Sequence, residues 1–172
     1  ASLPQVDVPT IRNIIDTAPN GYLEPDKVQL LLDAAGIPRA KEIVVTTKED
    51  AIKAADAIKY PLVMKVVGPV HKSDVGGVKL NIKDADTVST TFVEMMKIKD
   101  ATGVLLQPML SGTELFIGAK KEEDFGHLIL CGLGGIFIEI LKDVQVALAP
   151  VSKSEAQDMI KSLRAYKIIE GA

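Results

Sequence analysis

A single lysine lies inside an otherwise apolar run, where it could bind an anion. The run Leu62-Val63-Met64-Lys65-Val66-Val67 predicts a buried strand, and strand alternation places Lys65 on the same face as Val63 and Val67. An ammonium group that is buried without a partner is costly, so an anionic ligand at the strand end would resolve the conflict. The alternative is an edge strand from which Lys65 reaches water.

The loop that follows this strand has the composition of a phosphate site. It runs from Gly68 to Lys79 and contains Gly76 and Gly77, with Lys72 before them. Successive glycine N–H groups can converge on an anion without interference from a Cβ atom. The Walker A pattern G-x-x-x-x-G-K-[ST] is absent from the sequence. A long hairpin loop with solvated lysines is the alternative.

His71 lies in the same loop and could act as a nucleophile toward a phosphoryl group. Asp74 could orient its ring and leave the other ring nitrogen free. The alternative is a solvated loop histidine without a catalytic role. The other histidine, His127, reads as structural, and two histidines and Cys131 at scattered positions do not make a zinc-type site.

Residues 107–114 could recognise a nucleoside. A proline in Gln107-Pro108-Met109 removes a ladder donor, which suits a strand edge or a hinge. A hinge leaves backbone N–H and C=O groups available to an adenine edge, with Met109 as an apolar wall. Glu114 could accept hydrogen bonds from two ribose hydroxyls. An ordinary strand end and a surface carboxylate are the alternatives.

Two carboxylates could contribute to a magnesium site. Glu139 and Asp143 lie on or just after a predicted strand, and a turn between Leu141 and Lys142 would bring them together. Surface carboxylates are the alternative. The preceding Gly132-Leu133-Gly134-Gly135 lacks the spacing G-x-G-x-x-G and no helix is predicted after it, which argues against a Rossmann dinucleotide site.

The rest of the pattern predicts the elements that position these residues. Apolar spacing, Pro25 at a first helical position and the capping residues Thr47, Asp84 and Ser152 predict helices at about 25–35, 48–58, 85–98 and 153–163. Strands are predicted at 43–45, 62–67, 78–82, 103–110, 114–120, 128–131, 136–141 and 144–148. Ser111-Gly112 reads as a hairpin turn and Gly132–Gly135 as a further turn. Residues 1–22, with three prolines, predict a linker or arm.

These elements predict an α/β (α+β) fold of two helix-backed, mainly antiparallel sheets, forming two lobes that meet near residues 105–110. The 172 residues carry a net charge of −3, which argues against a nucleic-acid partner. The longest apolar runs are far short of the roughly 20 residues of a membrane span. A lone Cys131 and an N-terminus without a signal pattern favour the cytoplasm.

Two long segments resemble the ATP-grasp domain of the NDP-forming acyl-CoA synthetases, which include ADP-forming acetyl-CoA synthetase and relatives of succinyl-CoA synthetase. They are YPLVMKVVGPVHKSDVGGVKLNI at 60–82 and LLQPMLSGTELFIGAKKEEDFGHLILCGLGGIFIEILKDVQVALAPVS at 105–152. The match runs from about Glu24 to Ser152. The resemblance implies an ATP-grasp fold with lobes at 23–106 and 107–172, and residues 1–22 as the connector from a CoA-binding half.

The resemblance also implies that Mg-ATP or Mg-ADP lies between the two lobes. It assigns six residues to the nucleotide, with Lys65 at the phosphates, Gly76 and Gly77 in a flexible lid, Gln107 and Met109 at the adenine, and Glu114 at the ribose. It gives His71 a part in relaying phosphoryl groups from a phosphohistidine of the CoA-binding half. The implied reaction is acyl-CoA + ADP + phosphate ⇌ acid + CoA + ATP.

Family members continue into a D-I-N-P-like segment and an aspartate that bind the metal, and this sequence ends before them. We therefore expect an incomplete C-terminal lobe that is weak or inactive alone, with Glu139 and Asp143 as minor contributors to the metal site. A non-catalytic nucleotide-binding or interaction module, and an ATP-grasp ligase that forms an acylphosphate, are the alternatives. A contact surface for a homo-oligomer could include Phe116, Ile117, Phe137 and Ile138 if they are exposed.

Overall fold

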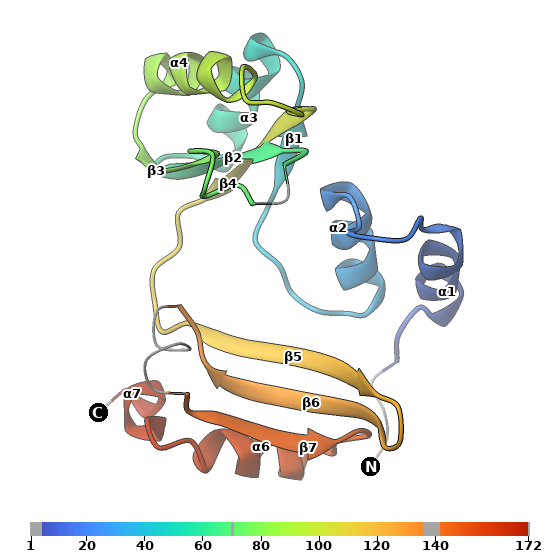
Figure 1. Cartoon of the computed structure of the whole chain (residues 1–172). Helices are drawn as coiled ribbons and strands as arrows, with labels where there is room; N and C mark the ends of the chain where they lie inside the picture. The colour runs from blue at the N-terminus through green and yellow to red at the C-terminus, as the bar shows by residue number, and fades with distance from the viewer. Residues whose placement is uncertain (1–4, 70, 136–141, 172) are drawn as a thin grey trace. The chain divides into compact units, whose positions relative to one another are not determined.

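The computed structural model describes residues 5–69, 71–135 and 142–171, and the chain divides into two compact units (Figure 1). Residues 4–110 form the N-terminal unit and residues 111–172 form the C-terminal unit. Both units combine helices with antiparallel sheets, which confirms the predicted fold class. Within the described ranges, no helix is both long and apolar enough to cross a membrane.

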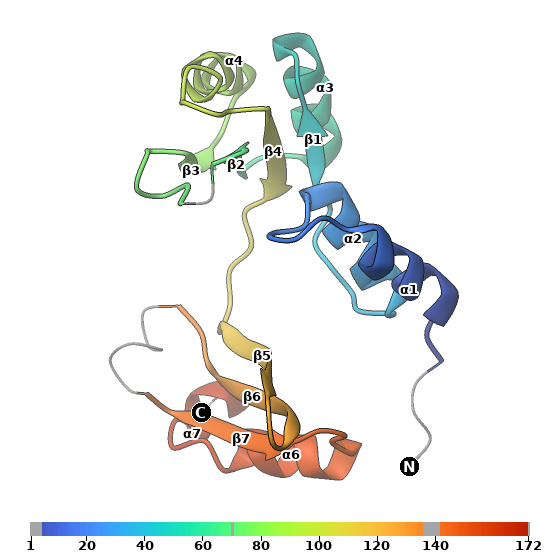
Figure 2. The same cartoon turned by 45° about the vertical axis from the view of Figure 1, so that its right-hand side comes forward.

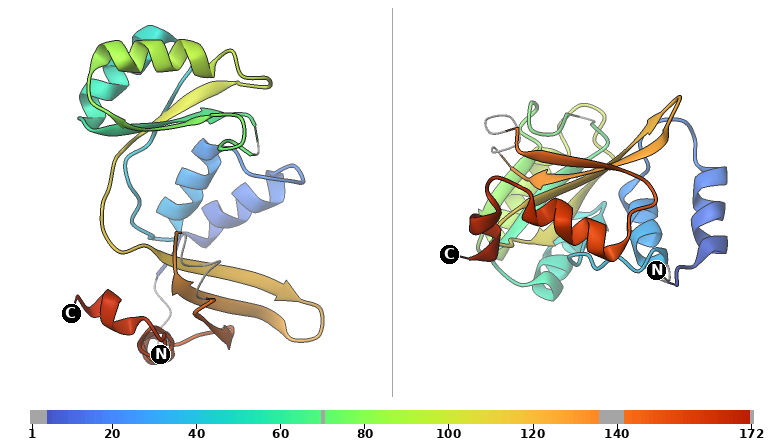
Figure 3. Two further views of the ribbon diagram at one scale, coloured as in Figure 1. Left: turned by 60° about the vertical axis from the view of Figure 1, so that its left-hand side comes forward. Right: turned by 90° about the horizontal axis from the view of Figure 1, so that it is seen from below.

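The N-terminal unit is built on a four-stranded antiparallel sheet in the order β1-β4-β2-β3 (Figure 2). Its strands are β1 (Ile43–Val45), β2 (Leu62–Val67), β3 (Val78–Ile82) and β4 (Gly103–Pro108). Two helices, α3 (Lys48–Ile58) and α4 (Ala85–Met95), pack together on one face of the sheet (Figure 3). The side chains of Thr47 and Asp84 accept backbone N–H groups at the two helix starts, which confirms both predicted caps. Helix α4 ends at Met95, somewhat earlier than predicted.

Alternation along β2 divides its side chains between the two faces of the sheet. Leu62, Met64 and Val66 are fully buried in the core beneath α3 and α4, and each contributes about 1.5–3 kcal/mol by leaving water. Val63 and Val67 are also buried, and Lys65 is half-buried between them on the opposite face. Because β2 lies between β4 and β3, the alternative of an edge strand is wrong.

The N-terminal residues form a helix that the sequence did not predict. Helix α1 (Val8–Thr17) packs against α2 (Pro25–Ala34) where the prolines indicated a linker or arm. Pro9 lies in the first turn, where a missing N–H costs nothing, and Asp7 caps the helix by accepting the N–H of Thr10 at 3.1 Å. Ile14 is buried, which is the apolar anchor of this helix.

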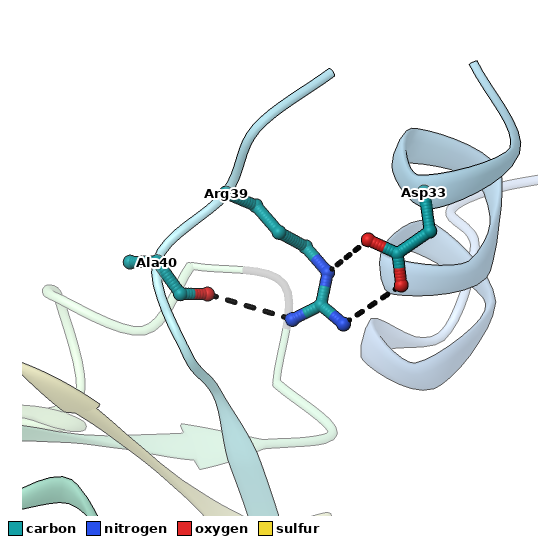
Figure 4. A network of polar contacts seen from close by, with 3 residues as sticks. All are labelled: Asp33, Arg39 and Ala40. Atoms are coloured by element: carbon teal, nitrogen blue, oxygen red, sulfur yellow. Dashed lines mark hydrogen bonds and ion pairs between the residues drawn. The ribbon is translucent and has the colours of Figure 1, made fainter. Parts of the chain in front are cut away.

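A forked ion pair fixes the connection between α2 and β1 (Figure 4). The Nε and Nη2 atoms of Arg39 donate to the two carboxylate oxygens of Asp33, each at 2.9 Å, and Nη1 reaches the carbonyl of Ala40 at 3.5 Å. The hydrogen bond from Arg39 lowers the pKa of Asp33, and the same bond raises the pKa of Arg39. Because the pair is exposed, we expect it to hold the course of the chain after α2 and to add little to the free energy of unfolding.

The hairpin predicted at Ser111-Gly112 is wrong. Strand β4 pairs with β1 on one edge and with β2 on the other, so it has no edge left for the next strand. Strand β5 (Leu115–Glu122) instead pairs with β6 (Gly126–Leu133) in the other unit. A Ser-Gly pair between two apolar runs marks a turn, but it does not determine which strands pair.

The C-terminal unit has a three-stranded antiparallel sheet in the order β5-β6-β7, followed by two helices. The remaining elements are β7 (Val144–Leu148), α6 (Lys153–Lys161) and α7 (Tyr166–Glu170). Ser152 and Glu155 form the predicted capping box of α6. Strand β6 continues through Gly132, where the sequence predicted a turn, because Gly132 pairs with Phe116 of β5 and with Val144 of β7. The pairing also brings the carbonyl oxygen of Asp143 close. A Cβ atom at position 132 would lie 2.6 Å from that oxygen.

Two other expectations concern this unit. The predicted strand at 136–141 lies outside the described residues, and so do Phe137 and Ile138 of the predicted contact surface. The remaining two residues of that surface are exposed, Phe116 by 37% and Ile117 by 75% of their area. They lie on opposite faces of β5, because successive strand residues alternate. They therefore do not form one continuous patch.

Candidate functional site

The sheet face opposite α3 and α4 carries a cavity of about 640 Å³ around Lys65. It is lined by residues of β2, β3 and the loop between them, namely Lys65, His71, Lys72, Ser73, Asp74, Val78 and Leu80. The structure therefore brings the lysine of the apolar strand together with the polar residues of the loop. Two ammonium groups, a hydroxyl and an imidazole suit a phosphorylated ligand, and the carboxylate of Asp74 is the anionic group of this lining.

The predicted glycine nest is not formed by its two glycine amides. The N–H of Gly77 donates to the carbonyl of Lys72 at 2.7 Å, and the N–H of Gly76 donates to the carbonyl of Ser73 at 3.2 Å. Both donors are used inside the loop, so the expectation that they face an anion is wrong for this structure. The assignment of Gly76 and Gly77 to a lid over the phosphates stays a prediction.

The two glycines are needed for different physical reasons. Gly76 has a φ of +69° and open space where a Cβ atom would lie. Gly77 packs tightly, because a Cβ atom there would lie 2.3 Å from Cγ1 of Val66 and 2.9 Å from the carbonyl oxygen of Lys72. Val66 is fully buried, so its side chain has little room to shift. Gly77 therefore holds the loop against the end of β2.

We expect Gly77→Ala to lower the free energy of unfolding by about 2–3 kcal/mol, because the new methyl group overpacks a buried side chain and the loop backbone. Gly76→Ala is the matched control, with only the strain of a positive φ, about 1 kcal/mol. Urea unfolding followed by circular dichroism measures both. Equal stability of the two variants would contradict the tight packing at Gly77.

His71 is exposed and lines two cavities. Besides the cavity at Lys65, it borders one of about 250 Å³ between residues 22–25 and the start of the loop. Among the described residues, no hydrogen bond joins His71 to Asp74, so the expected orientation of the ring by that carboxylate is not seen. His127 is exposed on β6, and its carbonyl accepts the N–H of Ala149 at 2.8 Å.

In the predicted adenine hinge, the backbone N–H of Met109 and the side-chain amide of Gln107 have partners within the protein. The N–H of Met109 donates to the carbonyl of Pro61 at 3.2 Å, so this backbone donor of the hinge is already used within the fold. The side-chain amide of Gln107 lies between the ammonium of Lys65 and the carboxylate of Glu42. Met109 is 40% exposed and keeps an apolar surface. Contact of Gln107 and Met109 with adenine stays a prediction.

In the C-terminal unit, Glu114 lies in a cavity of about 420 Å³. The cavity is lined by Gly112, Thr113, Glu114, Leu133, Gly134, Gly135 and Ile168. The N–H of Gly134 donates to the carbonyl of Glu114 at 2.7 Å, and a Cβ atom at Gly135 would lie 3.1 Å from Oε2 of Glu114. The sequence pattern predicted a turn at these glycines and argued against a Rossmann site, whereas the structure shows that they make room for this carboxylate.

The carboxylate of Asp143 is bonded to the backbone of its own unit. Its carboxylate is buried and accepts the N–H groups of Ala165 at 2.9 Å and Arg164 at 3.0 Å, just before α7 begins. The hydrogen bond from Ala165 is the main cause that lowers the pKa of Asp143. Glu139 lies outside the described residues. In the described ranges, no three His, Cys, Asp or Glu side chains are placed to hold a metal ion, and a metal role for Glu139 and Asp143 stays a prediction.

Comparison with known proteins identifies the fold. The profile of the ATP-grasp domain family matches residues 15–172. The beta subunit of ADP-forming acetate–CoA ligase I from Pyrococcus furiosus is 39% identical over 173 residues, covering 94% of this chain and 75% of that subunit. ADP-forming acetate–CoA ligase II from Archaeoglobus fulgidus is 46% identical over 144 residues, or 82% of this chain. The chain spans only 21% of the length of that larger enzyme.

Solved structures agree with this result. Dinucleotide-forming acetyl-coenzyme A synthetase 1 of Ca. Korarchaeum cryptofilum, in complex with coenzyme A, Ca-AMPCP and HgCl+, aligns with a TM-score of 0.84 and 34% identity, covering 94% of this chain and 76% of that chain. The same enzyme with coenzyme A and Mg-AMPPCP, its phosphohistidine segment pointing towards the nucleotide binding site, aligns with a TM-score of 0.76 and 32% identity, covering 93% and 74% of the two chains. The resemblance of residues 60–82 and 105–152 is thus confirmed: the chain belongs to the ATP-grasp domains of the ADP-forming acetate–CoA ligases.

Proposed function

We propose that this chain is the nucleotide-binding part of an ADP-forming acyl-CoA synthetase, which converts acyl-CoA, ADP and phosphate into acid, CoA and ATP. The observation that carries the proposal is the cavity in which Lys65, Lys72, Ser73 and His71 meet on one sheet face. The family supports it, because the P. furiosus relative is a beta subunit of such a ligase and aligns along most of both chains.

The cavity supplies what phosphoryl transfer requires. Transfer depends mainly on positioning and on neutralising the charge that spreads over the phosphoryl oxygens. In our proposal the ammonium groups of Lys65 and Lys72 neutralise the β- and γ-phosphate oxygens, and the hydroxyl of Ser73 donates a hydrogen bond to them. Because Lys65 projects from a buried strand with packed neighbours, its position is held before the nucleotide arrives.

His71 carries the phosphoryl group in this proposal. A neutral ring nitrogen attacks the phosphorus of a phosphohistidine on the CoA-binding half, the new N–P bond forms, and the N–P bond to that histidine breaks. A terminal phosphate oxygen of ADP then attacks the same phosphorus, which forms ATP and restores neutral His71. The exposure of His71 supports this role, because the ring must meet a donor from outside the chain.

We assign the ribose and the adenine of the nucleotide to residues of the two units, each considered by itself. Glu114 accepts the ribose hydroxyls, since its carboxylate lies in a cavity whose glycines leave room beside it. Met109 contacts the adenine as the apolar surface, and Gln107, also predicted to bind the nucleotide, has its side-chain amide between Lys65 and Glu42. The nucleotide binds as its magnesium complex, but the described residues offer no metal cluster, so no step is assigned to a metal ligand of this chain. We place the protein in the cytoplasm, where acyl-CoA and ADP are available.

The partner in this proposal is a CoA-binding half that carries the phosphohistidine. It is supported by the K. cryptofilum enzyme, which holds coenzyme A and a phosphohistidine segment directed to its nucleotide site. Without that half, the chain binds nucleotide but does not convert acyl-CoA. Residues 1–22 lead into it, as the connector expected from the sequence.

Calorimetric titration with ADP, ATP, AMP and adenosine tests the proposal. We expect affinity to rise with the number of phosphates, because two ammonium groups line the cavity. Binding of ADP and ATP with no phosphorylation of histidine, even with the CoA-binding half present, would instead favour a non-catalytic nucleotide-binding module. No binding of any nucleotide would refute the proposed site. Acylphosphate trapped by hydroxylamine would indicate the other kind of ATP-grasp ligase.

A further inference from the structure

A carboxylate that neither the sequence motifs nor the proposed reaction uses lies next to the nucleotide cavity. Glu42 immediately precedes β1 and is half-buried beside β4. Strand pairing sets Ile43 opposite Leu106, so Glu42 comes level with Gln107. On the other side of β4, Gln107 lies opposite Val63, which shares its sheet face with Lys65. Three neighbouring strands thus bring Glu42, Gln107 and Lys65 into one row.

The amide of Gln107 joins the two charged groups. With the amide oriented as its neighbours require, Nε2 donates to Oε1 of Glu42 at 3.3 Å, and Oε1 accepts from Nζ of Lys65 at 3.3 Å. The chemistry of the neighbours fixes this orientation, because a carboxylate only accepts hydrogen bonds and an ammonium only donates them. A reversed amide would place oxygen against oxygen and donor against donor. The charges on either side therefore orient the amide.

The arrangement keeps the Lys65 charge available. A direct ion pair between Glu42 and Lys65 would neutralise the ammonium that the phosphates need. The intervening amide holds the ammonium by a neutral acceptor and leaves its positive charge directed to the cavity. The pKa of Arg39 is raised mainly by its hydrogen bond to Asp33 and, to a smaller extent, by the charge of Glu42. Arg39 already donates to both carboxylate oxygens of Asp33. Among the described residues, Glu42 makes no direct ion pair, and its carboxylate faces the amide.

We propose that Glu42 is a positioning residue for the phosphate-binding lysine, acting through the side-chain amide of Gln107. The inference rests on the proposed function, since it assumes that Lys65 meets the phosphates of ADP or ATP. It also gives the side chain of Gln107 a role at the phosphates instead of at the adenine. Both ends of its amide are occupied, so a hydrogen bond to adenine would require one of these bonds to break. Both residues then serve phosphate binding.

Two measurements on the whole chain test the inference. We expect Glu42→Ala to weaken ADP binding about three- to tenfold. The variant loses the hydrogen bond that orients the Gln107 amide, and with it the position of the Lys65 ammonium. Adenosine affinity should stay within twofold, because it has no phosphate for Lys65. Glu42→Gln keeps an acceptor oxygen and should recover most of the affinity, and Glu94→Ala, on the exposed side of α4, is the matched control. Equal weakening of ADP and adenosine would overturn the inference.

The route through Gln107 has its own test. In a Gln107→Met background, Glu42→Ala should have no further effect on ADP affinity, whereas additive effects would show that Glu42 acts elsewhere. In ¹H–¹⁵N spectra without nucleotide, Glu42→Ala should shift the side-chain NH₂ signals of Gln107 and leave those of Gln145, which donates to Ser162, unchanged. If the wild type binds no nucleotide, the proposed function fails, and these signals alone decide: a shift supports the network and no shift refutes it.

Discussion

Lys65→Ala is expected to weaken ATP and ADP binding about 30- to 100-fold, the loss of roughly 2–3 kcal/mol for a charge-assisted contact to phosphate. The effect is large because Lys65 is half-buried between Val63 and Val67, where water competes poorly for its ammonium. Adenosine binding should change little. Calorimetric titration of each ligand measures the difference between them.

A matched control exists in the neighbouring strand. Lys79 lies between Val78 and Leu80, which line the cavity, but Lys79 itself does not line it and pairs with Met64 on the helix-covered side. Lys79→Ala removes the same charge from the same sheet and should alter ATP affinity by less than about threefold. Equal losses from Lys65→Ala and Lys79→Ala would mean that only the general charge of this surface matters. Unchanged affinity in Lys65→Ala would remove Lys65 from the site.

His71→Asn is expected to lower acyl-CoA-dependent ATP synthesis about 10³-fold or more when the chain is assayed together with its CoA-binding half. Asparagine occupies similar space and hydrogen bonds, but it has no nitrogen lone pair that can accept a phosphoryl group. ATP affinity should stay within about twofold, because the phosphate contacts at Lys65 remain. The effect therefore falls on turnover and not on binding.

Labelled phosphate gives the direct readout. Radioactive γ-phosphate from ATP should appear on the wild-type chain as an acid-labile, alkali-stable adduct, as phosphohistidine does. His127→Asn, on β6 in the other unit, should label like the wild type, whereas His71→Asn should not. Label that persists in His71→Asn, or full turnover by that variant, would show that this histidine carries no phosphoryl group.

The local elements of this fold follow from short-range signals. The caps Thr47, Asp84 and Ser152 each bond an N–H three residues on, so a local pattern was enough to place three helix starts. The run around Lys65 predicted both a strand and the face of the lysine. Helix α1 was missed because Pro9 reads as a breaker, although a proline in a first helical turn is tolerated.

Pairing and side-chain bridges required the tertiary structure. The Ser111-Gly112 turn gave no sign that β4 already had two neighbours. The glycines at 76 and 77 looked like anion donors, yet their N–H groups bond inside the loop and Gly77 is needed for packing. Glu42 lies 23 residues before Lys65 and 65 before Gln107 in the sequence, so no local motif could connect them. Asp143 likewise meets its partners only through folding.

The central claim is that ADP binds at Lys65 and the loop after β2. Mapping ADP-induced shifts in the amide ¹H–¹⁵N spectrum of the chain, residue by residue, tests it most directly. We expect the largest shifts at Lys65, at residues 71–78 and at Glu114 with Gly134 and Gly135, and weaker shifts with AMP. Saturable shifts confined to other surfaces, with Lys65 and residues 71–78 unaffected, would contradict the proposed nucleotide site.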